Sequence, residues 1–208
     1  MKKIFLSLTV ALLAAASCLA QNLPLPAPQK KGGKSVIETL WARESGNEYS
    51  EKTLSSQDLS NLLFAAIGVN RENGKLTSPT ASNRQEIRVF VFAEEGVCEY
   101  LNKENSLKPV AIGDYRGLIA GRQDWVKTAP ISLLIVADGT VFGSVNERSM
   151  TMMAVDAGIV SENIAIFCAG TGLVTRPRAS METDAIKKLL NLDDTQFPLM
   201  NHPVGYKK

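Results

Sequence analysis

Apolar positions along the chain follow two periods, and these periods separate the expected helices from the expected strands. Apolar residues three and four positions apart predict helices over Ser35–Arg43, from Ser55 or Ser56 to about Ile67, and over Gly117–Val126, Ser149–Gly170 and Glu182–Leu190. Short runs bounded by turn residues predict strands over Ile87–Ala93, Val97–Leu101, about Leu107–Val110, Ala129–Ala137 and Leu199–Tyr206. This order indicates an α+β fold with an antiparallel or mixed central sheet flanked by helices.

Two of these segments are apolar on every side. Residues 129–137 contain the continuous run ISLLIVA, which is typical of a central strand covered on both faces. The Ser149–Gly170 segment is the longest expected helix and is apolar nearly all round. A helix of this kind is buried, either in the core or in a subunit interface.

The first twenty residues have the layout of a secretory signal peptide. Lys2 and Lys3 precede an almost continuous apolar run over Ile4–Ala16, which is too short for a comfortable membrane span, and small residues follow. Cleavage after Ala20 would start the mature chain at Gln21. An alternative is a lipoprotein that begins at a lipidated Cys18, the one route by which we expect a membrane attachment. Both alternatives predict an exported protein, located in the periplasm.

Residues 21–34 are rich in Pro, Gly and Lys and are expected to form a linker, so that residues 35–208 form one folded domain. A net charge of +2 gives no basis for nucleic-acid binding. Cys98 and Cys168 are interpreted as small buried thiols, and with only one histidine in the chain they predict no Cys/His zinc site.

The sequence contains no evident nucleotide-binding motif and no evident set of catalytic side chains. The segment Gly68–Lys75 lacks the spacing of a phosphate-binding P-loop, and Gly170–Gly172 lacks the third glycine of a dinucleotide fingerprint. His202 has no acidic neighbour in sequence and is interpreted as a surface or packing residue, and Asp193 and Asp194 as helix-capping residues. If the chain is an enzyme, a cofactor must carry the reaction.

Three separated segments, in order, resemble the motifs of the FMN-dependent nitroreductase family. Arg43–Tyr49 (RESGNEY) is similar to the family's R-x-S-x-R/K-x-F/Y motif, and Ser78–Glu86 (SPTASNRQE) to its (S/A)-P-S-A-x-N-x-Q-P/E loop before a strand. Asp156–Ser180 is similar to its long interface helix and the loop that follows. The C-terminal Pro203–Lys208 (PVGYKK) is similar to the closing V-G-Y/F-P motif, so the resemblance covers residues 35–208.

The resemblance implies a nitroreductase-like fold that dimerises through a long buried helix, with FMN in the interface between two identical subunits. The implied cofactor-binding residues are Arg43, Ser45, Asn47, Pro79, Thr80, Ala81, Asn83, Gln85, Arg178, Ala179, Ser180 and Lys207. An Arg fork and a hydroxyl suit the FMN phosphate and ribityl chain, and both ends of the Asn83 amide can hydrogen-bond the cofactor. No residue is expected to act as acid or base, because the flavin carries the chemistry.

Two departures from the family pattern bear on the cofactor. Asn47 replaces a basic residue, and the chain stops soon after Tyr206; Arg176 or Arg178 could replace the missing charge. Three functions remain open: an oxidoreductase in which NADH, NADPH or another donor reduces FMN and the flavin reduces a small organic acceptor, an FMN-dependent dehydrogenase of a small or peptide-derived substrate, and a flavin-binding or interaction protein without turnover.

Overall fold

The computed structural model describes residues 21–208, and the expected signal peptide with Cys18 lies outside the described residues. Seven strands form one sheet in the order β1-β4-β3-β2-β5-β7-β6. Every neighbouring pair is antiparallel. The strands are β1 (Leu23–Pro24), β2 (Ile87–Ala93), β3 (Gly96–Leu101), β4 (Ser106–Ile112), β5 (Ile131–Asp138), β6 (Leu173–Thr175) and β7 (Gln196–Tyr206). The α+β expectation is confirmed, with a sheet that is antiparallel rather than mixed.

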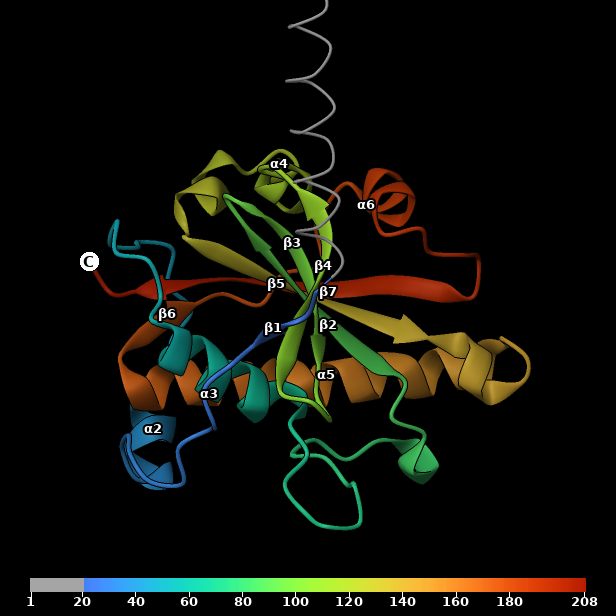
Figure 1. The fold of residues 1–208 in the computed structure, drawn as a ribbon, viewed down its shortest axis with the longest axis horizontal. Coiled ribbons are helices and arrows are strands. Elements are labelled where there is room, and N and C mark those ends of the chain that lie inside the picture. Colours follow the sequence, from blue (N-terminus) through green and yellow to red (C-terminus); the bar gives the residue numbers. More distant parts are fainter. Residues whose placement is uncertain (1–20) are drawn as a thin grey trace, which may run out of the picture.

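Helices cover both faces of the sheet, which gives three layers (Figure 1). On one face lie α2 (Val36–Ala42), α3 (Ser56–Ile67) and α5 (Glu147–Thr171); on the other lie α4 (Arg116–Ala120), α6 (Thr183–Leu189) and the 3-10 turn η2 (Asp124–Thr128). Two further 3-10 turns are η1 (Ala81–Asn83) and η3 (Gly139–Phe142). Strand β5 is buried along nearly its whole length, as its apolar run predicts, because alternate side chains enter the two opposite cores.

Helix α5 is the long element against which one face of the sheet packs. Asn146 caps its N-terminus through a reciprocal bond pair with Ser149, and Gly172 ends it in the left-handed region at φ 79°. Its inner face is buried, whereas Val155 on its outer side is 53% exposed. Within residues 21–208 it is the one helix long and apolar enough to cross a membrane, but its packing on the sheet is that of a core helix.

The chain between β4 and β5 does not form the single helix predicted over Gly117–Val126. It forms α4, then a turn, then η2. Gly121 ends α4 at φ 55° and ψ −120°, a conformation that interrupts helical hydrogen bonding and that L side chains rarely adopt. The sequence pattern also missed β6, a three-residue strand that follows Gly172 and pairs with the end of β7.

The Pro-rich segment before Ser35 is extended, yet it packs on the domain. Leu23 and Pro24 pair with the start of β4, the Leu25 N–H donates to the Asn105 carbonyl at 3.0 Å, and the Ser60 hydroxyl donates to the Pro26 carbonyl at 2.6 Å. The folded domain therefore begins before Ser35, and these residues extend the edge of the sheet.

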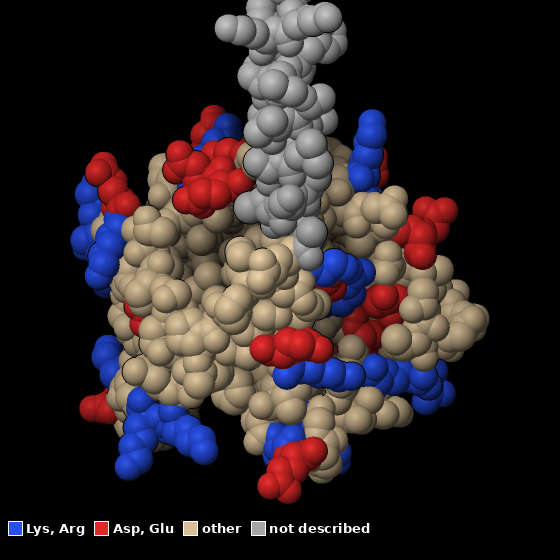
Figure 2. All heavy atoms as spheres, viewed as in Figure 1, with Lys and Arg blue, Asp and Glu red and all other residues tan. Residues whose placement is uncertain are grey.

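Charged side chains lie mainly around the margin of the face seen in Figure 2, and positive and negative groups alternate there. The centre of this face carries mostly uncharged residues. Opposite charges that alternate in this way produce no extended field of one sign on this face.

Candidate functional site

Four of the predicted cofactor residues gather where α2 ends and β7 ends. Arg43 is the C-cap of α2. The chain that follows is attached to β6 by a hydrogen bond from the Gly46 N–H to the Thr175 carbonyl, at 3.0 Å. Tyr49 then forms a β-bridge with Lys207. We call Arg43, Ser45, Asn47 and Lys207 the Arg43 cluster. The sequence placed these residues far apart, and the fold brings the two ends of the domain together.

The Arg43 cluster suits a phosphate group. All four side chains are exposed, and they combine a guanidinium, an ammonium, a hydroxyl and an amide. The Lys207 ammonium lies 3.1 Å from the Glu44 carboxylate, an exposed ion pair that costs little to exchange for a phosphate. The hydrogen-bond donors present therefore fit the phosphate end of FMN.

The second set of predicted residues forms the Asn83 loop, defined here as Ser78–Gln85. Ser82, Asn83 and Gln85 all adopt φ of 55°, in the left-handed region, and the Thr80 hydroxyl accepts from the Gln85 N–H at 2.9 Å. The Ala81 N–H donates to the Asp156 carboxylate of α5 at 2.8 Å. These bonds hold the exposed Asn83 side chain on a fixed turn.

Within this loop, Gln85 supports the turn. Its amide nitrogen donates to the Gly74 carbonyl at 3.0 Å and to the Asn83 side-chain oxygen at 3.3 Å. Because the second bond occupies the side-chain oxygen of Asn83, the amide nitrogen of this exposed residue is left as a donor. Pro79 is exposed, and Thr80 and Ala81 are half-buried.

The third predicted segment, after β6, divides into an inner and an outer part. Ala179 and Ser180 are exposed, as a surface against a flat cofactor ring requires. Arg178 is 7% exposed, and its guanidinium donates to the carbonyls of Ile119 and Ala120 and to the side chains of Gln123 and Asn201. With its donors directed inward, Arg178 holds this loop onto α4 and has a structural role in place of the predicted cofactor contact.

Arg176 is the better candidate for the charge that Asn47 lacks. Its guanidinium lies over the Trp125 ring at 5.4 Å and is only half-buried. Burial raises the pKa of Tyr49, and the charges of Arg176 and Arg178 both oppose this rise. Arg176 directly follows Thr175, whose carbonyl accepts from the Gly46 N–H, so its backbone lies beside the Arg43 cluster.

A buried pair of carboxyl groups lies beneath the Asn83 loop, and no motif or periodicity in the sequence predicts it. Glu86 is 1% exposed and Asp156 is 4% exposed. Within residues 21–208 no donor reaches either carboxylate oxygen of Glu86. Burial, and then the hydrogen bond to Asp156 that only the protonated acid can donate, raise the pKa of Glu86 to about 7.

His202 is a packing residue within the core and not a surface residue. It is fully buried on β7, with the Ser161 hydroxyl 2.8 Å from Nε2 and the Thr175 hydroxyl 3.1 Å from Nδ1. The Thr175 hydroxyl donates to the Pro203 carbonyl, so it accepts from Nδ1–H and fixes the neutral tautomer. Burial lowers the pKa of His202 to about 3. This histidine ties α5 and β6 to β7.

The two cysteines also lie away from the exposed site. Cys168 is buried in α5, where burial raises the pKa of its thiol, and Cys98 is half-buried in β3. The expectation of a buried thiol is thus confirmed for Cys168 and only partly met at Cys98.

The Arg43 cluster and the Asn83 loop lie toward opposite ends of α5 (Figure 1). The loop contacts Asp156 and shares a cavity with residues 146–152, whereas a second cavity beside Lys207 is lined by α5 only from Ala165 onward. At a rise of 1.5 Å per residue, Asp156 and Ala165 are already about 13 Å apart along the helix axis. Within one chain the predicted site is therefore divided into two halves.

Comparisons with known proteins agree with these features. The family model described as the nitroreductase family matches residues 41–206. A nitroreductase homologue of Methanocaldococcus jannaschii is 29% identical over 183 residues, which cover 82% of this chain and 90% of that protein.

Solved structures show the same fold. A nitroreductase homologue from Ralstonia eutropha JMP134 superposes with a TM-score of 0.83 at 29% identity and covers 90% of both chains. A chain of the Escherichia coli microcin synthetase complex superposes with a TM-score of 0.70 at 22% identity, over 88% of this chain and 76% of that one. The chain described here belongs to the nitroreductase family of oxidoreductases.

Proposed function

We propose that this protein is an FMN-dependent oxidoreductase in which NADH, NADPH or another donor reduces the flavin and a small organic acceptor reoxidises it. The observation that supports this proposal is the Arg43 cluster: the Tyr49–Lys207 bridge and the Glu44–Lys207 ion pair bring two distant parts of the family motif side by side, and the exposed donors there suit a phosphate. When bound, the flavin supplies the redox chemistry, and the chain supplies binding and orientation.

The residues divide the binding task. Arg43 and Lys207 neutralise the phosphate, with Arg176 as a further cation, and Ser45 donates or accepts a hydrogen bond at the ribityl chain. The Asn83 amide and the backbone at Ala179 and Ser180 are placed to meet the ring. Glu86 and Asp156 act on the ring only through the loop that they anchor.

A homodimer would complete the site. The two halves lie at separate ends of α5, so a twofold axis across the outer face of α5 would bring the Arg43 cluster of one chain to the Asn83 loop of the other. That surface is apolar: Val36 is 70%, Ile37 65%, Leu40 54% and Trp41 88% exposed on α2, and Val155 is 53% exposed on α5. Apolar side chains in such numbers mark an interaction surface.

A second candidate is an FMN-dependent dehydrogenase that oxidises a small or peptide-derived substrate. The structural likeness to a chain of the microcin synthetase complex, which was solved with a truncated precursor peptide bound, favours keeping this candidate. Export also bears on it, because the periplasmic location that we propose from the first twenty residues would deprive the enzyme of abundant nicotinamide donors.

The test is to purify residues 21–208 and measure flavin absorbance, then bleaching by NADH or NADPH under anaerobic conditions. We expect a yellow protein that a nicotinamide bleaches and that Arg43→Ala renders colourless. Lys103→Ala, which removes an exposed cation from the β3–β4 turn, is the matched control and should keep its flavin.

The other outcomes are equally informative. A yellow protein that no nicotinamide reduces would support the dehydrogenase. A colourless protein that FMN cannot reconstitute would refute both enzymes and leave an interaction protein without cofactor.

A further inference from the structure

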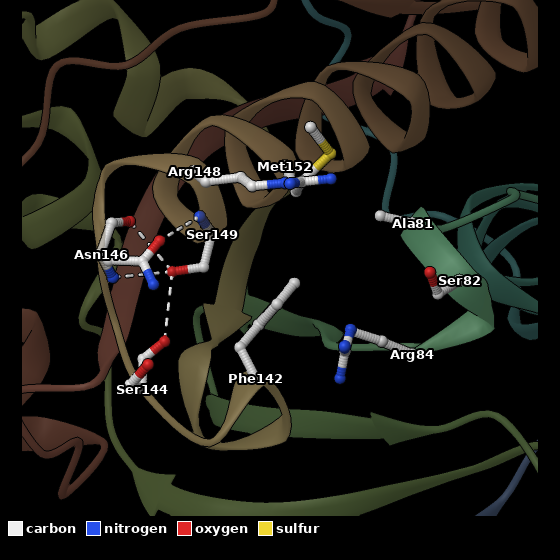
Figure 3. A pocket seen from close by; sticks show the side chains of 9 residues that line it. All are labelled: Ala81, Ser82, Arg84, Phe142, Ser144, Asn146, Arg148, Ser149 and Met152. Carbon is white, nitrogen blue, oxygen red and sulfur yellow. Dashed lines mark hydrogen bonds between the residues drawn. The ribbon is translucent and has the colours of Figure 1, made fainter.

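A cavity of about 240 Å³ lies between the Asn83 loop and the N-terminal part of α5 (Figure 3). It is enclosed by that loop, by η3 and by the first turns of α5. The side chains that line it are Ala81, Ser82, Arg84, Phe142, Ser144, Asn146, Arg148, Ser149 and Met152. All of these belong to one chain, so the cavity exists in the folded subunit before any partner or cofactor binds.

The cavity has positive charge and no compensating acid. Arg84 reaches it from the loop and Arg148 from the first turn of α5, and no Asp or Glu lines it. Within the described part of the chain no carboxylate pairs with either guanidinium. An anion that enters would therefore not have to displace an existing ion pair.

Arg84 is already oriented. Its Nη1 donates to the Val141 carbonyl at 2.7 Å, and its guanidinium lies over the Phe142 ring at 4.8 Å. Those contacts fix the planar fork while leaving further N–H groups free to bind a ligand, which lowers the entropy lost on binding. Arg148 is exposed, and no hydrogen bond to its side chain is found among residues 21–208.

Two further polar side chains of the cavity already have partners. Asn146 and Ser149 bond each other across the helix cap, and the Ser149 hydroxyl also donates toward the Ser144 and Asn146 carbonyls. Phe142 and Met152 supply apolar walls (Figure 3). The charged groups that remain for a ligand are thus the two guanidiniums, with the exposed Ser82 and Ser144 beside them, and they lie next to surfaces that suit a flat ring.

We propose that this cavity binds a small aromatic carboxylate, with Arg84 and Arg148 holding the carboxylate and Phe142 and Met152 contacting the ring. Its volume lies below the roughly 300–1,000 Å³ typical of pockets for drug-sized ligands, which suits one ring and excludes a dinucleotide. Because Ala81 and Ser82 belong both to this cavity and to the loop that we assign to the flavin ring, such an anion is the acceptor class of the oxidoreductase when its ring carries a nitro group, which takes up the electrons and protons. This last step rests on the proposed function, whereas the binding of the anion does not.

The first experiment compares 4-nitrobenzoate with 4-nitrobenzamide, which differ in charge but hardly in shape. The flavin-loaded protein should reduce the carboxylate with a kcat/KM roughly tenfold higher than the amide, since a charge-assisted contact is worth about one to two kcal/mol more than a neutral one. In Arg148→Gln this ratio should fall to near one. Arg122→Gln, which removes an exposed charge between α4 and η2, should keep the wild-type ratio.

The second experiment separates this proposal from the proposed function. Binding of benzoate to flavin-free protein is measured by calorimetry or ligand-detected NMR, with benzamide as the neutral probe. Benzoate should bind to the wild type and to Arg122→Gln, weaken with added salt, and bind at least tenfold more weakly to Arg148→Gln.

Those results would establish the anion site even if the protein never held a flavin. Equal binding of benzoate to the wild type and to Arg148→Gln, or equal binding of benzoate and benzamide, would overturn the assignment even if the flavin reaction proceeded. Arg148 is exposed and forms no ion pair or side-chain hydrogen bond within residues 21–208, so its substitution should leave the fold intact and either outcome can be interpreted.

Discussion

Arg176 and Arg178 are two positions apart in sequence, and both guanidinium groups lie over the Trp125 ring. They differ in burial: Arg178 is buried and donates to the Ile119 and Ala120 carbonyls, whereas Arg176 is only half-buried. Sequence reasoning proposed both as replacements for the charge missing at Asn47. Which of them faces outward depends on the alternation of side chains after β6, and β6 is too short for a sequence pattern to detect.

The two arginines therefore predict different consequences when each is replaced by Gln. Arg178→Gln should lower the free energy of unfolding by about 2–4 kcal/mol, because it removes the charged donor of the Ile119 carbonyl and of the buried Asn201 side-chain oxygen. Arg176→Gln should change stability by less than about 1 kcal/mol, the scale of an exposed cation–π contact, and weaken FMN binding instead. Urea unfolding and flavin titration of both variants would measure the contrast; the reverse pattern would contradict these assignments.

Glu86 predicts how stability changes with pH. The pKa of this carboxyl is about 7 in the folded chain against 4.5 for an unperturbed one, so between these values the folded chain keeps a proton that the unfolded chain releases. Stability should then be full below pH 4.5 and fall as pH rises through 7, by up to about 3 kcal/mol.

Replacing Glu86 with Gln should remove this loss, because the amide stays neutral and can still donate to Asp156. We expect urea midpoints of Glu86→Gln to exceed those of the wild type at pH 8 and to approach them at pH 5. The lowered pKa of the buried His202 has the opposite effect, because it makes the protein lose stability as pH falls below 6.5. Both proteins contain His202, so this effect is the same in each and cancels in the comparison. Parallel pH curves for the two proteins would show that Glu86 is ionised in the fold.

At the scale of elements, periodicity predicted most helices and strands because each buries one continuous face. The predicted Ser149–Gly170 helix extends to Glu147–Thr171, and the predicted strand Ile87–Ala93 has the same bounds as β2. Failures occurred where a backbone conformation or a distant partner decides the structure. Gly121 interrupts the helix expected after Gly117, and β1 forms only because the start of β4 lies opposite it.

The segment before Ser35 is fixed by an interaction that no local pattern could reveal. Asn105, in the turn between β3 and β4, receives the Leu25 N–H at its carbonyl, and its side-chain amide donates to the Pro26 carbonyl at 2.8 Å. Its side-chain oxygen accepts from the Tyr100 hydroxyl at 2.9 Å. Asn105 thus joins the start of the segment to the sheet, while residues of α3 hold its later part.

Asn105→Ala should therefore loosen the start of this segment. The loss of the two side-chain bonds, together with φ of 45° at this position, should cost about 2–3 kcal/mol and speed tryptic cleavage after Lys30 and Lys31. Asn102→Ala, in the same turn, is the matched control. It removes a hydrogen bond from the Asn102 side-chain amide to the Ile67 carbonyl, and this bond does not involve residues 21–34. Equal cleavage rates in the two variants would contradict the anchoring role.

At the scale of the whole molecule, sequence motifs identified the residues of the site but not their arrangement. The order of motifs along the chain carries no information on distance, and so the Arg43 cluster and the Asn83 loop could be read as one pocket. The length of α5 places them apart, and the exposed Trp41 and Val155 mark the surface across which a second chain would bring the halves together.

A divided site predicts a cis–trans difference in mixed dimers. Co-expression of differently tagged Arg43→Ala and Asn83→Ala chains should give heterodimers that hold about one FMN, because one of the two sites draws an intact cluster from one chain and an intact loop from the other. Co-expression of the doubly substituted chain with the wild type should give heterodimers with no intact site, since every pairing then includes one altered half. The tandem-tag-purified dimers are compared by flavin absorbance per protein. If each chain instead built a site from its own residues, the two results would be exchanged, and a purely monomeric protein would yield no heterodimer at all.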